Sequence, residues 1–187
     1  MTAEIEDTLF TLGAWSENGP QASKIALEAG VSEGEAMAMV QVAWAMICTY
    51  TRRTYCPVPS GEVLVRVKGM ALFRWPRWPE PAEVETQMLI NGEWKPCAAK
   101  YIKGVGVELD GSGYYRLAQV GTVPAPEIPA QVFAAVQNLA TYLLVQGPAR
   151  REFKTQGAGD SNFSRESMMG ALYGSGAGAM IAGEVRL

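Results

Sequence analysis

Residues 32–54 read SEGEAMAMVQVAWAMICTYTRRT, and this stretch decides the fold. Ser32 is placed to cap the start of a helix, and Glu35, three residues later, completes a capping box that satisfies two backbone N–H groups. Apolar residues then recur at steps of three and four, which places them on one helical face. The members of this face are Ala36, Met39, Val40, Val42, Ala43, Met46, Ile47 and Tyr50. The sequence therefore predicts one long helix, with Arg52 and Arg53 in its last turn and its end before Pro57.

A helix this apolar needs a partner, and residues 129–146 form the other comparable segment. Pro129 suits the first turn, where its missing N–H costs nothing, and Gly147-Pro148 is expected to end the helix. Its apolar face consists of Val132, Phe133, Val136, Leu139, Ala140, Leu143 and Leu144. We expect the two long helices to pack together, with the intervening chain as an insertion.

The N-terminal region is expected to add two short helices. In residues 2–15, Ile5, Leu9 and Leu12 share a helical face, and acidic residues lie near the start, where they favour the helix dipole. A turn at 16–20 separates this segment from a second short helix over 21–29, which is capped by Gly30.

Between the long helices, residues 62–120 change from helical to alternating periodicity. Val63, Val65 and Val67 alternate with other residues, which indicates a half-buried strand. Asn91-Gly92 separates two strand-like runs, 84–90 and 93–95, and favours a hairpin with a type I′ turn. Further strands are expected over 98–103, 105–109 and 114–120. The insertion is thus predicted to be a small antiparallel sheet, and the fold class to be α+β.

The entry to this sheet, LFRWPRWPEP at 72–81, holds three prolines, which exclude a helix or a central strand. Its tryptophans and arginines allow two interpretations: they cover the end of the sheet or of the helix pair, or they contact a partner protein, as Trp and Arg often do. The residues expected in subunit or tail contacts are Arg74, Trp75, Arg77, Trp78, Asn91, Gly92 and Trp94.

The composition shifts after Lys154, and residues 155–187 are rich in glycine yet carry large apolar side chains. We expect an extended arm that becomes ordered on a neighbouring subunit or a partner; a flexible tail fits the composition equally well. The predicted organisation is therefore a body over 1–154 and an arm over 155–187. The basic residues at 150, 151 and 154 favour a solvated helix end over an anion site.

The totals exclude several classes of function. With 187 residues and 48% hydrophobic residues, the chain forms one domain or a domain with arms, and its net charge of −3 disfavours wrapping nucleic acid. The chain has no histidine, and its three cysteines lack metal-ligand spacing and are expected to be reduced thiols. No nucleotide-binding glycine pattern, signal peptide or transmembrane run is recognised, which indicates synthesis in the cytoplasm. We predict no catalytic, metal-binding or cofactor-binding residues, no cofactor and no enzymatic activity.

Four motifs follow one another in a characteristic order. They are AWAMICTYTRRTY at 43–55, LFRWPRWP at 72–79, the strand, glycine and proline run at 115–129, and the Arg-Glu segment at 150–164 that ends in GAGDSNFS. In this order they resemble the head–tail connector (adaptor) proteins of long-tailed bacteriophages and related gene transfer agents.

The resemblance implies a structural role in the neck of a virion, between the capsid portal and the tail. Such adaptors form a ring, usually of twelve subunits, that extends the DNA channel, docks the stopper or tail-terminator protein and lets double-stranded DNA pass without sequence-specific binding or membrane contact. It also implies that the C-terminal arm grips the portal protein. The residues expected to do so are Phe163, Met168, Met169, Leu172, Tyr173, Met180, Ile181, Val185 and Leu187.

Two alternatives stay open. The chain could be another neck component, such as a stopper or tail-completion protein, although those are mostly β. It could also be a small α+β ligand-binding domain or enzyme, which a large, mainly hydrophobic pocket with convergent polar groups would support.

Overall fold

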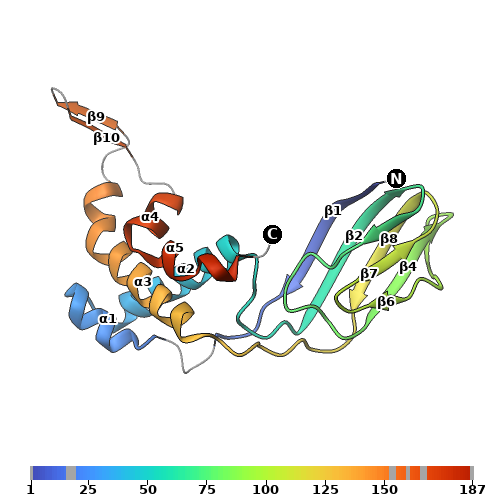
Figure 1. Ribbon diagram of the computed structural model, residues 1–187, viewed down its shortest axis with the longest axis horizontal. Helices are drawn as coiled ribbons and strands as arrows, with labels where there is room; N and C mark the ends of the chain where they lie inside the picture. Colours follow the sequence, from blue (N-terminus) through green and yellow to red (C-terminus); the bar gives the residue numbers. More distant parts are fainter. Residues whose placement is uncertain (1, 16–19, 152–154, 159–160, 165–167, 186–187) are drawn as a thin grey trace. The chain divides into compact units, whose positions relative to one another are not determined.

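The computed structural model describes residues 2–15, 20–151, 155–158, 161–164 and 168–185, without the side chains of residues 147–151, 155–158 and 161–164. The chain divides into two compact units (Figure 1). The β unit comprises Met1–Trp15 and Thr54–Pro126, and the helical unit comprises Ser16–Arg53 and Glu127–Leu187. The protein is thus α+β, as predicted. In the described part of the chain, no helix is both long and apolar enough to span a membrane.

The main sheet of the β unit has five antiparallel strands in the order β1-β2-β8-β4-β5. These strands are β1 Thr2–Thr11, β2 Ser60–Lys68, β4 Val84–Ile90, β5 Glu93–Pro96 and β8 Gly113–Gln119. Val63, Val65 and Val67 of β2 are buried, which confirms the predicted alternation. The predicted hairpin is also present, because Asn91 and Gly92 between β4 and β5 both have positive φ, at 53° and 83°.

A second sheet of three antiparallel strands, in the order β3-β7-β6, completes the β unit. Its strands are β3 Ala71–Phe73, β6 Tyr101–Ile102 and β7 Gly106–Leu109. Inward side chains of both sheets form one core, which includes Phe73, Val107 and Leu109 from the smaller sheet. Gly106 permits the close approach of β7 to β3, because a Cβ there would lie 2.3 Å from the carbonyl oxygen of Phe73.

The helix expected over residues 2–15 is wrong, since this segment forms strand β1. It pairs with the whole length of β2, from Thr2 opposite Lys68 to Thr11 opposite Ser60. Ala3 and Phe10 pack against the core, whereas Leu9 of the supposed helical face is exposed. Pairing with a strand distant in the sequence therefore overrides the local helical spacing.

The helical unit begins with α1 Ala22–Ala29, which ends at the left-handed Gly30, as predicted. Helix α2 spans Glu33–Thr51, and its predicted capping box between Ser32 and Glu35 is present. The helix ends earlier than expected because Arg52 adopts the left-handed conformation, so Arg52 and Arg53 lie beyond the last turn.

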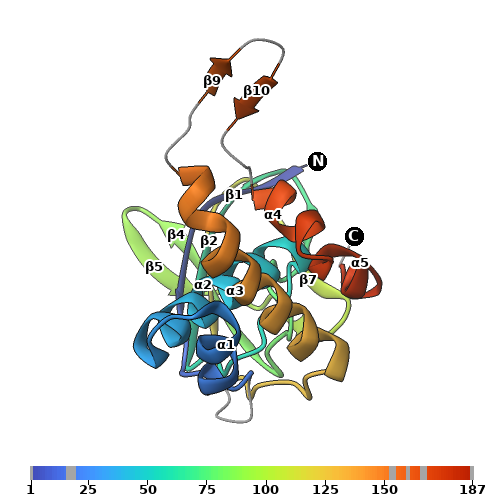
Figure 2. The same ribbon diagram turned by 90° about the vertical axis from the view of Figure 1, so that its left-hand side faces the viewer.

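Helix α3 spans Ala130–Arg151 and packs against α2 (Figure 2). The ring of Phe133 meets the ring of Trp44 edge-on, with centroids 5.9 Å apart. The expected end at Gly147-Pro148 is wrong, because α3 continues past it. A residue before proline is biased against the helical conformation but is not excluded from it.

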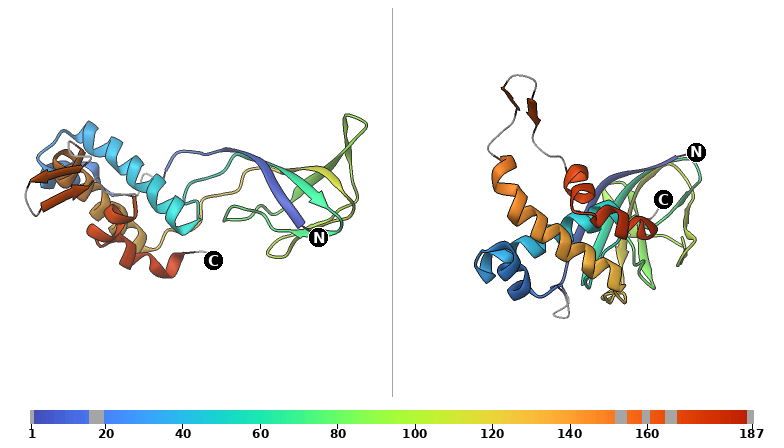
Figure 3. Two further views of the ribbon diagram at one scale, coloured as in Figure 1. Left: turned by 90° about the horizontal axis from the view of Figure 1, so that it is seen from above. Right: turned by 60° about the vertical axis from the view of Figure 1, so that its left-hand side comes forward.

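The chain after α3 is not the unsupported arm that the sequence suggested. Strands β9 Thr155–Ala158 and β10 Ser161–Ser164 pair with each other. They are followed by α4 Met168–Gly174, α5 Ala177–Met180 and the 3₁₀ helix η1 Ala182–Glu184. Helices α4 and α5 pack against α3 (Figure 3). We call residues 168–185 the C-terminal cap of the helical unit.

Candidate docking surface

The apolar residues of the C-terminal cap divide into two groups. Leu172 and Ile181 are completely buried in the helical unit, as is the small residue Ala177, and Ala171 is 4% exposed. The expectation that Leu172 and Ile181 bind a partner is therefore wrong, because they hold the cap onto its own unit. Burial of a leucine or isoleucine side chain contributes about 1.5–3 kcal/mol.

The second group points outward. Met168, Met169, Tyr173 and Met180 are exposed by 39%, 41%, 59% and 42%. Met169 and Tyr173 are four residues apart on α4 and so share a face of that helix. A Cβ added at Gly178 of α5 would lie 3.3 Å from the Tyr173 ring, so this ring lies over Gly178. Flexible methionines beside a tyrosine are typical of surfaces that bind proteins.

Polar contacts tie the cap to the rest of the helical unit. Arg53, just after α2, forms an ion pair of 3.0 Å with Glu184, and the Gln131 side chain donates to the same carboxylate at 3.2 Å. Tyr173 and Tyr50 share a hydrogen bond of 3.4 Å between their hydroxyl oxygens. This bond, with a smaller contribution from burial, raises the pKa of Tyr50 above its usual value. These contacts hold the cap against the helical unit, so its exposed side chains have a defined position on that unit.

For the other three predicted portal-binding residues, the structure says little about exposure. Phe163 lies on β10, but its side chain is outside the described part of the chain. Val185 is half-buried after η1, and Leu187 lies outside the described residues.

The proline- and tryptophan-rich segment supports the β unit internally. Trp75 is 2% exposed and meets the Phe10 ring of β1 edge-on, with centroids 5.8 Å apart. The guanidinium of Arg77 lies 4.5 Å from the centre of the same Phe10 ring and donates to the Thr54 hydroxyl at 3.0 Å. The expectation of a partner contact is therefore wrong for Trp75. The half-buried Arg77 side chain already contacts the Phe10 ring and the Thr54 hydroxyl within its own unit. Trp75 belongs to the hydrophobic core of the β unit.

The other residues predicted to make contacts remain accessible. Arg74 is exposed, and Trp78 is half-buried, with its carbonyl accepting from the Thr54 backbone N–H. Asn91 and Gly92 are exposed at the hairpin turn, and Trp94 is half-buried opposite Leu89.

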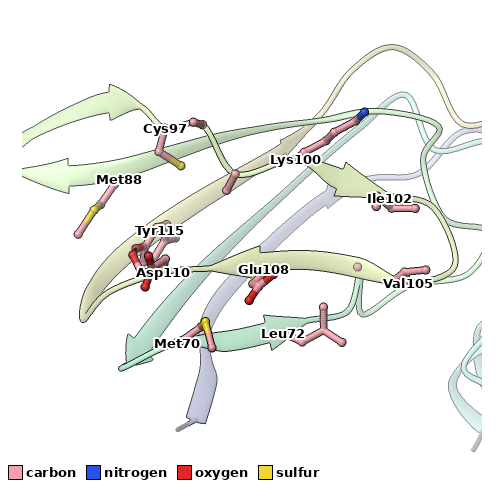
Figure 4. Close-up of a pocket in the computed structure, with 13 residues that line it drawn as sticks. Met70, Leu72, Met88, Cys97, Lys100, Ile102, Val105, Glu108, Asp110 and Tyr115 are labelled. Carbon is pink, nitrogen blue, oxygen red and sulfur yellow. Dashed lines mark hydrogen bonds between the residues drawn. The ribbon is translucent and has the colours of Figure 1, made fainter.

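The β unit also carries a groove of about 710 Å³ that the sequence did not reveal (Figure 4). We call it the apolar groove. Its exposed apolar residues are Met70, Leu72, Ile102 and Val105, and Met88 and Cys97 also line it. Leu72 and Ile102 point away from the core that buries Ala71 and Phe73. The sequence did contain a sign of this exposed apolar surface. Residues 71–73 are all apolar, and successive side chains of a strand point to opposite faces, so at least one of them has to point away from the core.

The chemistry of the groove does not favour catalysis. Lys100, Glu108 and Asp110 line it as exposed side chains, and the Tyr115 hydroxyl donates to the carbonyl oxygen of Asp110. Burial raises the pKa of Tyr115 above its usual value, so the phenol stays protonated near neutral pH. In the described residues, no group of three or more His, Cys, Asp or Glu residues could hold a metal ion.

The three cysteines are free thiols, as predicted. Cys56 is fully buried, and this burial raises the pKa of its thiol above the usual value, although the nearby Arg77 opposes the shift. A buried, protonated thiol is a poor nucleophile.

Comparison with known proteins gives likenesses of structure alone. No protein-family model matches the chain, and no curated protein matches it. Among solved structures, it is similar to a chain in the neck of an empty gene transfer agent particle, with 15% identity, 94% of this chain and 95% of that chain covered, and a TM-score of 0.44. A chain in the neck of the native particle, computed with C12 symmetry, is 13% identical over 89% of this chain and 94% of its own length, with a TM-score of 0.46. A chain of the native gene transfer agent virion is 15% identical, with coverages of 92% and 94% and a TM-score of 0.41.

Proposed function

We propose that this protein is a non-enzymatic head–tail connector of the adaptor type, and that its C-terminal cap docks onto the portal. The observation that carries the proposal is the division of the cap into buried anchors and exposed contacts. Leu172 and Ile181 fix the cap, while Met168, Met169 and Tyr173 remain available to a partner. The order of sequence motifs, which resembles that of adaptors, supports the same role.

The proposed docking uses a surface prepared in advance. An extended arm loses conformational freedom when it binds, whereas α4 and α5 are already folded against α3. Exposed methionines adapt to the shape of a partner, and Tyr173 supplies a rigid aromatic contact. A ring of copies would repeat this surface around a channel, and the net charge of −3 agrees with DNA that passes without binding.

The test measures binding of the full chain to the assembled portal ring of the same particle. The variant Met168→Asp/Met169→Asp places two charges on the exposed start of α4, where acidic residues are compatible with the helix. We expect its affinity for the portal to fall at least about tenfold, since desolvating a carboxylate in an apolar contact is costly. Leu27→Asp, at an 85% exposed position on α1, is the matched control and should bind normally.

The outcomes separate the proposals. If the double variant retains its fold by circular dichroism and binds as the unchanged chain does, the cap is not the docking surface. If the unchanged chain does not bind an intact portal ring, the adaptor role is wrong.

A stopper is the second candidate, and the all-β character of the unit that holds residues 54–126 favours it. A stopper would bind the ring on the tail side and leave the portal free. The same binding assay, run with each ring separately, distinguishes the two roles.

A further inference from the structure

The hairpin of β4 and β5 extends beyond the sheet that supports it. Strand β4 pairs with β8 only from Val84 to Met88, whereas its pairing with β5 continues to Ile90. Residues 89–94, which we call the hairpin tip, are therefore a two-stranded projection. Two strands alone are marginally stable in water, so packing against another surface would stabilise the tip.

The hairpin tip carries the apolar side chains that such packing requires. Leu89 lies directly opposite Trp94, and both are half-buried. Ile90 is exposed by 42%. The turn itself requires only Asn91 and Gly92, which have positive φ, so turn formation does not explain an apolar side chain at position 90. Tryptophan is among the residues that contribute most to binding at protein interfaces.

The same β unit holds a surface that suits these side chains. The apolar groove exposes Leu72 by 54% and Ile102 by 53%, and Met70 and Val105 beside them by 46% and 49%. Leu72 and Ile102 come from the two outer strands of the β3-β7-β6 sheet, so the apolar surface crosses that sheet. An exposed patch of this kind marks an interaction site.

The hairpin tip cannot fill the groove of its own chain. Met88 and Cys97 line the groove where β4 and β5 leave the sheet (Figure 4). The tip continues along β4 beyond Met88, while Ile102 and Val105 lie at the opposite end of the groove (Figure 4). The type I′ turn matches the twist of the two strands, so β4 and β5 stay paired with each other up to Ile90 and Glu93.

We propose that the hairpin tip of one copy docks in the apolar groove of a second copy. The proposal rests on the proposed function in one respect, namely that copies of the chain assemble side by side. Charged side chains of both signs are present on the two surfaces: the groove offers Lys100, Glu108 and Asp110, and the hairpin offers Glu93 in the tip and Lys95 next to it. The exposed ion pair of Glu93 with Lys95 is long, at 3.7 Å, so both groups are free to exchange partners.

Such a contact joins two different surfaces of the same chain. Each copy that donates its tip still has an open groove, so association continues from copy to copy and ends only when a ring closes. The interface is therefore directional, and every copy uses its tip and its groove once.

The test exploits this directionality. Ile90→Asn damages the hairpin tip, and Ile102→Asn damages the groove, with no change of charge and at exposed positions where the fold should persist. Leu27→Asn, on an exposed position of α1, is the matched control. Association of the purified full-length chains is followed by sedimentation velocity, and folding by circular dichroism.

We expect the unchanged chain and the control to form oligomers, and each interface variant alone to associate at least about tenfold more weakly. An equimolar mixture of the two variants should form a dimer and stop there, because only one intact tip meets one intact groove. Assembly of either variant as strongly as the unchanged chain, absence of the mixed dimer, or a monomeric unchanged chain would each overturn the proposal.

This outcome is independent of the portal assay. The variants at Ile90 and Ile102 leave the C-terminal cap unchanged, and the cap variants leave the hairpin tip and the groove unchanged. Loss of one behaviour without the other therefore identifies which proposal has failed.

Discussion

Replacing Leu172 by alanine tests whether the C-terminal cap belongs to the folded helical unit. Leu172 has no exposed surface, and the substitution removes about three carbon atoms from its side chain. At about 0.8 kcal/mol for each carbon, the lost transfer free energy is about 2.4 kcal/mol. The cavity left behind adds to this loss, so we expect the free energy of unfolding to fall by about 3 kcal/mol.

The assay is urea unfolding followed by circular dichroism at 222 nm, which reports the helical unit. The midpoint should decrease while the denaturant slope is unchanged, because the native state stays compact. Met169→Ala is the control, since its exposed side chain should change the free energy by about 0.5 kcal/mol or less. A loss below about 1 kcal/mol for Leu172→Ala would refute the reasoning, because an arm detached from the body would tolerate the truncation.

Three further predictions concern residues that stabilise the β unit or the helical unit. Gly106→Ala should destabilise the β unit by more than about 2 kcal/mol in thermal unfolding, since φ is 117° and the added Cβ meets a carbonyl oxygen; an unchanged melting temperature would show that β7 can shift. A double-mutant cycle of Arg53→Ala and Glu184→Gln should give a coupling of about 1 kcal/mol, because the pair is partly buried, and additive effects would contradict it. The hydrogen bonds from Ser32 lower the pKa of Glu35, so its contribution to stability is present above the usual glutamate range and is lost as pH falls through the lowered pKa. Glu35→Gln should remove that part of the pH dependence of stability, and an identical pH profile in both proteins would contradict it.

The sequence predicted best the elements that local chemistry specifies. The start of α2 follows from the hydrogen-bonding groups of Ser32 and Glu35, which are adjacent on the helix. The hairpin of β4 and β5 follows from Asn91-Gly92, because few other residue pairs accept positive φ twice. The alternating valines of β2 likewise identify a strand with one buried face.

The elements that distant contacts specify were predicted wrongly or missed. Residues 2–11 carry apolar spacing compatible with a helix, and only the pairing with β2 makes them a strand. Leu172 and Ile181 occur in a glycine-rich segment without clear periodicity, so nothing local shows that they are buried. Partner binding by residues 155–187 stays a prediction, whereas the burial of Leu172 and Ile181 in their own unit became visible only in the structure.

Because β1 belongs to the β unit, each unit is built from two separate segments of the sequence. Residues 62–120 were expected to be a self-contained insertion between two helices, yet the sheet is completed by a strand that precedes α1. Phe10 of β1 contacts both Trp75 and Arg77, so the N-terminal strand holds the proline- and tryptophan-rich segment in place. The chain therefore passes between the units after residues 15, 53 and 126, and neither unit is a continuous segment.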